Sequence, residues 1–188
     1  MELPAQVQAA QRRAEELGFE LSSEPEVGRL IAFLSQGVPT GGRVLELGTG
    51  AGVGLAWIVH GIGQRDDVEV VSVELDGERA DLVRGAGWPE WVSIVQGDGA
   101  DLVGTLGSFD LIFPDAPGGK IFKLRKTVAA LRPGGVLLVD DMDLSRHSDP
   151  ELVAGLASVR DRLFEHSELI CAELTFASGV ILARRLRS

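Results

Sequence analysis

The stretch that decides the fold is Arg43-Val44-Leu45-Glu46-Leu47-Gly48-Thr49-Gly50-Ala51-Gly52-Val53-Gly54-Leu55-Ala56-Trp57-Ile58. It opens as a short apolar run around one acid, then has a glycine at every second position, and continues as an apolar, helix-like segment. This order is typical of a buried strand, a tight turn and the start of a helix. Glycines allow positive φ and let a ligand approach main-chain N–H groups that a Cβ would shield. The stretch therefore predicts a ligand-binding turn.

The spacing of these glycines is G-x-G-x-G, whereas a dinucleotide-binding fingerprint requires G-x-G-x-x-G. Counted from Gly48, the third glycine of that fingerprint falls on Val53, and counted from Gly50 it falls on Leu55. Neither frame fits, so an NAD-linked oxidoreductase is the least favoured reading of this turn.

The composition is that of a globular protein with a full core. The chain has 188 residues, of which 45% are apolar and 24% are charged, values that suit a single domain. Its net charge of −10 would repel phosphate backbones, so we expect no nucleic-acid partner. We interpret the two basic clusters as solvated charge; they are Lys120, Lys123, Arg125 and Lys126, and the tail Arg184, Arg185 and Arg187.

Several other functions are not supported by the sequence. The single cysteine, Cys171, cannot form an internal disulfide and lies in an apolar run, which indicates packing rather than catalysis. The histidines, His60, His147 and His166, lack ligand-like spacing, so a zinc site is not expected. No secretory pattern opens the chain, and the glycines of the uncharged stretch 47–64 argue against a membrane span. We therefore expect a cytoplasmic protein with no membrane partner.

Apolar runs alternate with helical patterns along the chain. We expect strands at 43–47, 68–73, 91–95, 109–113, 136–139, 169–176 and 180–184. We expect helices at 5–17, from 25 onward, after the glycine turn, and at 77–84, 120–131 and 152–164. Ser23 is predicted to cap the second helix with Pro25 in its first turn, and 133–135 to end the helix that begins at Lys120.

This alternation predicts an α/β fold with a parallel sheet and right-handed crossovers. The turn Ala177-Ser178-Gly179 joins the last two strands into a hairpin, so the last strand should be antiparallel. No repeat, linker or low-complexity segment interrupts the chain. We therefore expect one domain, residues 1–188, with a seven-stranded, mostly parallel sheet and helices on both faces.

The segment Glu46–Gly52 resembles the first motif of class I S-adenosylmethionine (SAM)-dependent methyltransferases. The order of expected elements, five βα units followed by an antiparallel last strand, is also similar to that class from about Ser23 to the end. The resemblance implies a Rossmann-like SAM-dependent methyltransferase domain. It also implies that the N-terminal helices, residues 1–36, pack on or cap the site.

Each of the first five expected strands has an acid at or near its carboxyl end. These acids are Glu46, Glu74, Asp98, Asp115, and the pair Asp140 and Asp141. Because ligands of open α/β sheets bind beyond the carboxyl ends of the strands, these side chains are expected along one rim. Any one of them alone would be equally well explained as a solvated loop acid.

The acids have separate roles in a SAM pocket. Glu74 would accept from both ribose hydroxyls, because a carboxylate's paired oxygens suit a vicinal diol. Asp98 would accept from the adenine amino group, and Glu46 with the turn amides would hold the aminoacyl end. The expected cofactor-binding residues are Glu46, Gly48, Thr49, Gly50, Gly52, Glu74, Leu75, Gly97, Asp98, Gly99, Asp115 and Ala116.

The remaining acids suggest a metal site at Asp115, Asp140 and Asp141, which follow two adjacent strands. Converging carboxylates raise one another's pKa unless a cation is present, and Mg²⁺ prefers oxygen ligands. The pattern is similar to the catechol-type, metal-dependent O-methyltransferases, as are Pro25 and Gly28. Those enzymes carry an Asp after the fourth strand, an Asp-Asn pair after the fifth, and a Lys soon after the first Asp.

This chain departs from that pattern. Asp141 stands where Asn is usual, Lys120 follows Asp115 by five residues rather than three, and the chain has no Tyr. An equally supported interpretation is that Asp140, Asp141 and Asp143 cap a loop and helix start while Lys120 is solvated.

The sequence thus predicts a SAM-dependent methyltransferase that acts on a small-molecule hydroxyl, with Lys120 and Asp115 as the catalytic residues. Mg²⁺ assistance is one version of this mechanism, in which the ion lowers the pKa of the attacking hydroxyl. Other versions are a metal-independent N-, C- or O-methyltransferase, an aminopropyltransferase of the same fold, or a SAM-binding protein without catalysis. The family resemblance also implies a homodimer.

Overall fold

The structure, a computed structural model, describes residues 2–187. Its strands are Arg43–Leu47 (β1), Glu69–Glu74 (β2), Val92–Gln96 (β3), Phe109–Pro114 (β4), Leu131–Val139 (β5), Leu169–Leu174 (β6) and Val180–Arg185 (β7). Its helices are Ala5–Leu17 (α1), Pro25–Gln36 (α2), Val53–Ile62 (α3), Gly77–Arg84 (α4), Gly99–Leu102 (α5), Pro117–Lys120 (α6), Leu124–Ala129 (α7) and Pro150–Phe164 (α8), with a 3₁₀ turn at Leu144–Arg146 (η1).

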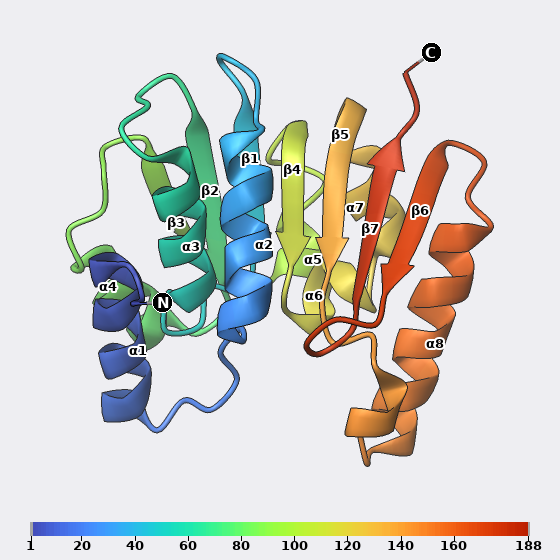
Figure 1. The fold of residues 1–188 in the computed structure, drawn as a ribbon, viewed down its shortest axis with the longest axis horizontal. Helices are drawn as coiled ribbons and strands as arrows, with labels where there is room; N and C mark the ends of the chain where they lie inside the picture. The colour runs from blue at the N-terminus through green and yellow to red at the C-terminus, as the bar shows by residue number, and fades with distance from the viewer. Residues whose placement is uncertain (1, 188) are drawn as a thin grey trace.

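The strands form one seven-stranded sheet in the order β3-β2-β1-β4-β5-β7-β6 (Figure 1). The first five strands pair in parallel, and β7 is antiparallel to both β5 and β6. The predicted Rossmann-like sheet with its antiparallel last strand is therefore confirmed.

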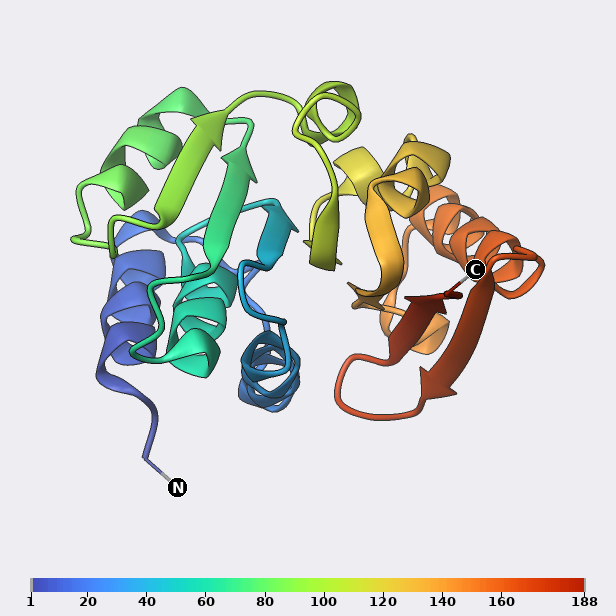
Figure 2. The same ribbon diagram turned by 90° about the horizontal axis from the view of Figure 1, so that it is seen from above.

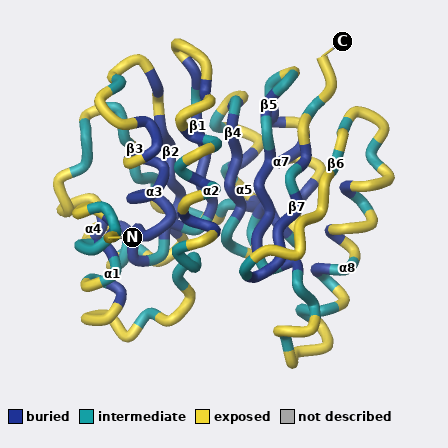
Figure 3. Tube along the Cα trace, viewed as in Figure 1, coloured by how far each residue is buried: buried dark blue, intermediate teal, exposed yellow. Residues whose placement is uncertain are grey.

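Helices cover the two faces of the sheet and make two apolar cores (Figure 2). On one face, α3 lies between the N-terminal helices α1 and α2 and contacts both, and nearly all of its residues are buried. On the other face, α7 and α8 pack on β4, β5 and β7. Burial is concentrated in the inner strands β1, β2, β4, β5 and β7 and in α3, whereas the edge strands β3 and β6 have no buried residue and the connecting loops are mostly exposed (Figure 3). The apolar runs of the inner strands are thus buried between helices.

Glycine lets α2 approach α3 closely. A Cβ at Gly28 would overlap the indole of Trp57, and a Cβ at Gly61 would overlap the main chain of Ala32. The lack of a side chain beyond hydrogen at Gly28 and Gly61 therefore sets the distance between these two helices.

The register of the central strands places the loops that carry function. Leu47, the last residue of β1, pairs with Val73 on one side and with Pro114 on the other. The residues that follow these three positions therefore emerge side by side at one edge of the sheet. They include the glycine turn, Glu74 and Asp115.

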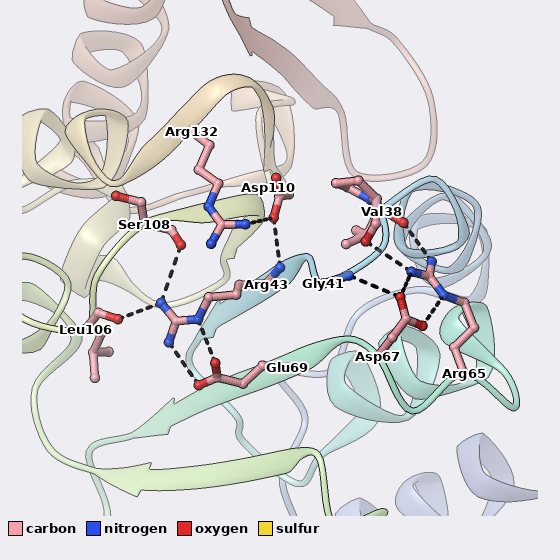
Figure 4. A network of polar contacts seen from close by, with 11 residues as sticks. Val38, Gly41, Arg43, Arg65, Asp67, Glu69, Leu106, Ser108, Asp110 and Arg132 are labelled. Carbon is pink, nitrogen blue, oxygen red and sulfur yellow. Dashed lines mark hydrogen bonds and ion pairs between the residues drawn. The ribbon is translucent and has the colours of Figure 1, made fainter.

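At the opposite edge, charged side chains tie the beginnings of the strands together (Figure 4). Arg43 forms two hydrogen bonds with Glu69, of 2.7 and 2.9 Å, and donates to the carbonyl of Leu106. Asp110 accepts from the Arg43 main-chain N–H at 2.8 Å and from Arg132 at 2.7 Å. This network is half-buried and distant from the glycine turn, so we interpret it as structural.

Three local predictions were wrong. Glu24, not Ser23, occupies the N-cap of α2, and no side-chain hydrogen bond caps that helix. The helix predicted at 120–131 is reduced to α7, because Lys120 ends α6, Lys123 has a positive φ of 65°, and Leu131 already begins β5. Residues 133–135 lie inside β5, where the pairing with β4 shifts from Phe109↔Leu131 to Leu111↔Val136. That bulge accommodates a Pro-Gly-Gly turn within a strand.

Within residues 2–187, no helix combines the length and the apolar character that crossing a bilayer requires.

Candidate active site

A cavity of about 670 Å³ opens at the carboxyl edge of β1, β2, β3 and β4. Most of the expected cofactor residues line it: Gly48, Thr49, Gly50, Glu74, Leu75, Gly97, Asp98, Gly99, Asp115 and Ala116. The structure therefore brings together side chains that lie far apart in the sequence, as the strand-end pattern indicated.

The glycine turn forms the floor of this cavity. The N–H groups of Gly48 and Thr49 donate to the Val73 carbonyl at 2.8 and 3.1 Å, which fixes the turn against β2. Gly48 has φ of 103°, and a Cβ there would lie 2.9 Å from the main-chain nitrogen of Ala116. Only glycine fits this position, because both the conformation and the space exclude a side chain. Beyond the turn, the first N–H groups of α3 have no partner within the helix and can bind a ligand carboxylate.

Glu74, at the end of β2, is held firmly in the wall of the cavity. Its side chain accepts hydrogen bonds from the Gly50 N–H at 2.8 Å, from the Asp76 N–H at 3.0 Å and from Arg79 at 3.2 Å. Each carboxylate oxygen has more than one acceptor position. Glu74 is therefore preorganised and can still accept from a ligand.

Asp98 caps α5, because its Oδ1 accepts from the Ala100 N–H at 2.7 Å. The neighbouring loop lies close by, since a Cβ at Gly99 would be 3.0 Å from the Gly118 carbonyl. Asp98 thus combines a capping role with a position on the cavity wall.

Two expected cofactor residues, Glu46 and Gly52, are not among those that line the cavity. Glu46 is 1% exposed and points under the start of α3. Its carboxylate accepts a hydrogen bond from the Ser72 hydroxyl, and the Ser72 hydroxyl oxygen lies 2.5 Å from the Thr49 hydroxyl oxygen. Burial raises the pKa of Glu46 well above its usual value. Gly52, with φ of 85°, is the N-cap of α3. Both residues support the turn from behind.

Other lining residues were not anticipated from the sequence. Phe19 lies against Gly50, since a Cβ on Gly50 would be 2.8 Å from the Phe19 ring. The Arg79 guanidinium lies over the same ring, with its Cζ 5.1 Å from the ring centroid. Phe122 and Lys123, between α6 and α7, close another side. The sequence held only a weak indication that Phe19 lines the cavity, namely that it directly follows Gly18, the glycine that ends α1.

A second cavity of about 380 Å³ adjoins the first and contains the other predicted acids, Asp140 and Asp141, together with Lys120. Five residues line both cavities: Leu21, Ser22, Ser23, Asp115 and Pro117. Among residues 2–187, the buried hydroxyl of Ser22 has no hydrogen-bond partner. The arrangement can hold two molecules whose reacting ends meet beside Asp115.

Burial controls the ionisation of the acids at this junction. It raises the pKa of Asp115 to about 7, although the Lys120 ammonium opposes the change. Burial also raises the pKa of Asp140, against the hydrogen bond from the Ser178 hydroxyl. Asp115 is thus poised to exchange a proton near neutral pH.

Lys120 is buried, with 4% of its surface exposed, so the interpretation of this residue as solvated was wrong. Its ammonium donates to Asp141 Oδ2 at 3.1 Å and to the Asp140 carbonyl at 3.2 Å. The turn at Gly119 directs the side chain inward, and Thr127 fixes that turn by donating to the Gly119 carbonyl at 2.7 Å. Asp143, in contrast, caps η1 as the sequence suggested.

The three acids of the predicted metal site do not assemble as a ligand set. Over residues 2–187, no group of three or more His, Cys, Asp or Glu side chains is placed to hold a metal ion. Asp140 Oδ1 already accepts from Ser178 and from the Asp141 N–H, and Asp141 pairs with Lys120. As arranged, the donor set does not fit Mg²⁺, because the Lys120 ammonium lies against Asp141 and hydrogen bonds already hold Asp140 Oδ1 and Asp141 Oδ2.

Comparison with known proteins agrees with this fold. Residues 45–142 match a family described as a methyltransferase domain. A protein of Mycobacterium tuberculosis named "Probable O-methyltransferase" is 31% identical over 191 residues, covering 94% of this chain and 83% of the relative.

Two solved structures share the fold. The O-methyltransferase TomG of Streptomyces achromogenes, solved with SAM, has a TM-score of 0.81 at 21% identity, over 98% of this chain and 91% of that one. An O-methyltransferase of Bacillus cereus, solved with S-adenosylhomocysteine (SAH), has a TM-score of 0.80 at 20% identity, over 98% of this chain and 92% of that one.

The fold and the strand-end site thus define a class I SAM-dependent methyltransferase. Within that class, the chain belongs to the methyltransferase domain family that includes the O-methyltransferases of the catechol type.

Proposed function

We propose that the first cavity holds SAM and that the second takes a small-molecule acceptor whose hydroxyl is methylated. The observation that carries this proposal is that the two cavities share Asp115 and the segment Leu21–Ser23. A donor and an acceptor in these cavities would meet at one point, which an in-line displacement requires.

The residues of the first cavity suit the parts of SAM. Glu74 would accept from the ribose hydroxyls, and Asp98 from the adenine amino group. The unpaired N–H groups at the start of α3 would bind the carboxylate of the aminoacyl end, a role expected of helix N-termini. Glu46 would act indirectly, by holding Thr49 and the turn through Ser72.

The residues of the junction suit methyl transfer. Bound SAM supplies a methyl group on a positively charged sulfur. The sulfur would leave with the electron pair of the carbon–sulfur bond as the acceptor oxygen takes the methyl group, and the Asp115 carboxylate would take the proton that the acceptor loses. Asp115 is suited to this task because its pKa lies near 7.

Two readouts test the proposal together. We expect calorimetry to show SAH binding, and transfer from labelled SAM to at least one member of a panel of phenols and catechols. The Asp115→Asn variant should still bind SAH and lose most of its turnover. Asp161→Asn, an exposed change on α8, is the matched control. Full turnover by Asp115→Asn would contradict the assigned role, and no SAH binding at millimolar concentration would contradict the function itself.

The finer statements about partners and location stay predictions. We propose that the acceptor is not a nucleic acid, because the net charge of −10 opposes binding to phosphate. The homodimer and the cytoplasmic location, which the sequence suggested, are tested by sedimentation and by cell fractionation.

A further inference from the structure

The side chain of Lys120 takes the position between the two acids at the end of β5. It contacts the Asp141 carboxylate at 3.1 Å and the Asp140 main-chain carbonyl at 3.2 Å, and it is almost fully buried. A buried ammonium needs such partners, because desolvating a charge is costly. The cluster therefore already contains a positive charge that belongs to the chain.

A divalent ion would have to compete with this ammonium. Mg²⁺ requires oxygen ligands at about 2.1 Å in octahedral geometry. Of the three acids, Asp141 is paired with Lys120, and Asp140 is held by Ser178 and by a main-chain N–H. Binding of the ion would compete with these contacts and place a second cation beside the buried Lys120 ammonium.

Lys120 also retains binding capacity toward the acceptor. An ammonium has three N–H donors, and the two contacts described use two of them. Lys120 lines the second cavity beside Asp115. One donor is thus available to a ligand oxygen there.

We propose that this protein methylates its acceptor without a divalent cation, and that the Lys120 ammonium instead positions one acceptor oxygen beside Asp115. The inference rests on the proposed function. It also specifies the acceptor: a metal that chelates two oxygens favours vicinal diols, whereas one N–H donor recognises a single hydroxyl. We therefore expect a phenol or alcohol with a single hydroxyl to be methylated with a kcat/KM similar to that of a catechol.

The first test measures metal binding and is independent of activity. Mn²⁺ titration followed by electron paramagnetic resonance compares the wild type with Lys120→Met and with the exposed control Lys126→Met. We expect the wild type and the control to bind Mn²⁺ no more tightly than about millimolar. Lys120→Met should bind at least about tenfold more tightly, because its acids lose their resident cation. A tight wild-type site that Asp141→Asn removes would overturn the proposal.

The second test measures activity in EDTA and in Mg²⁺ on paired substrates, a simple phenol and the matching catechol. We expect rates within about twofold in the two media, and comparable kcat/KM for the two substrates. Lys120→Met should raise KM by at least tenfold, and Lys120→Arg should restore part of the loss. A more than tenfold loss in EDTA that Mg²⁺ restores would overturn the proposal.

These results are distinguishable from failure of the proposed function. Absence of SAH binding, or of transfer to every acceptor, would count against the methyltransferase function. The Mn²⁺ comparison would still decide whether Lys120 replaces the ion. SAH binding and unfolding midpoints of the Lys120 variants show whether they are folded.

Discussion

The raised pKa of Asp115 predicts a specific dependence of stability on pH. Burial raises this pKa from 3.8 to about 7 in the folded state. The folded protein therefore binds more protons than the unfolded chain between about pH 4 and pH 7, so its stability falls as pH rises through this range. Three pH units correspond to roughly 4 kcal/mol at most, of which roughly 2.5 kcal/mol accrue between pH 5 and pH 8.

The comparison that isolates this effect is between the wild type and Asp115→Asn. Urea unfolding is measured at pH 5, 6, 7 and 8 for both proteins, and for Asp161→Asn as a control at an exposed site. Because asparagine does not titrate, the stability of the variant relative to the wild type should increase with pH by about 2 to 3 kcal/mol. The free energy of unfolding of Asp161→Asn should change with pH as that of the wild type does.

A constant difference between wild type and Asp115→Asn, within about 0.5 kcal/mol from pH 5 to pH 8, would refute this reasoning. It would mean that Asp115 titrates in the folded protein as it does in water. The junction of the two cavities would then be well hydrated, and Asp115 would no longer be suited to accept a proton near neutral pH.

Three further substitutions test the site and its support. Glu74→Gln removes a charge-assisted acceptor and should weaken SAH binding by about 10- to 100-fold in calorimetry, whereas Glu78→Gln on the surface of α4 should not change it by more than about twofold. Gly28→Ala would place a methyl group against the Trp57 indole and should lower the free energy of unfolding by about 1 to 3 kcal/mol. Leu137→Ala, at a fully buried position in β5, should lower it by about 2 to 5 kcal/mol. Unchanged SAH affinity in the first case, or an unchanged urea midpoint in the other two, would contradict the packing and contacts described.

The sheet and the rim of the cavity could be predicted from the sequence because both follow from periodic signals. Apolar runs marked the strands, and strands that alternate with helices form parallel sheets. Parallel pairing brings their carboxyl ends to one edge, so acids such as Glu74 and Asp98 could be placed along the first cavity without coordinates.

Side-chain direction within that rim could not be predicted. Glu46 lies inside β1, where successive side chains alternate between the two faces, and it turns under α3 rather than into the cavity. Lys120 is buried because positive φ at Gly119 and the bond from Thr127 redirect the chain between α6 and α7. Helical periodicity carries no information on such a break.

The position of β7 has a consequence for synthesis of the protein. This strand is made last, yet it lies between β5 and β6, so β6 has no partner in the sheet until β7 inserts. The turn that precedes β7 carries Ser178, whose hydroxyl restrains Asp140. A nascent chain lacking residues 178–185 would thus expose the β5 edge and leave Asp140 without its restraint, so the strand order ties completion of the β6–β7 hairpin to formation of the second cavity.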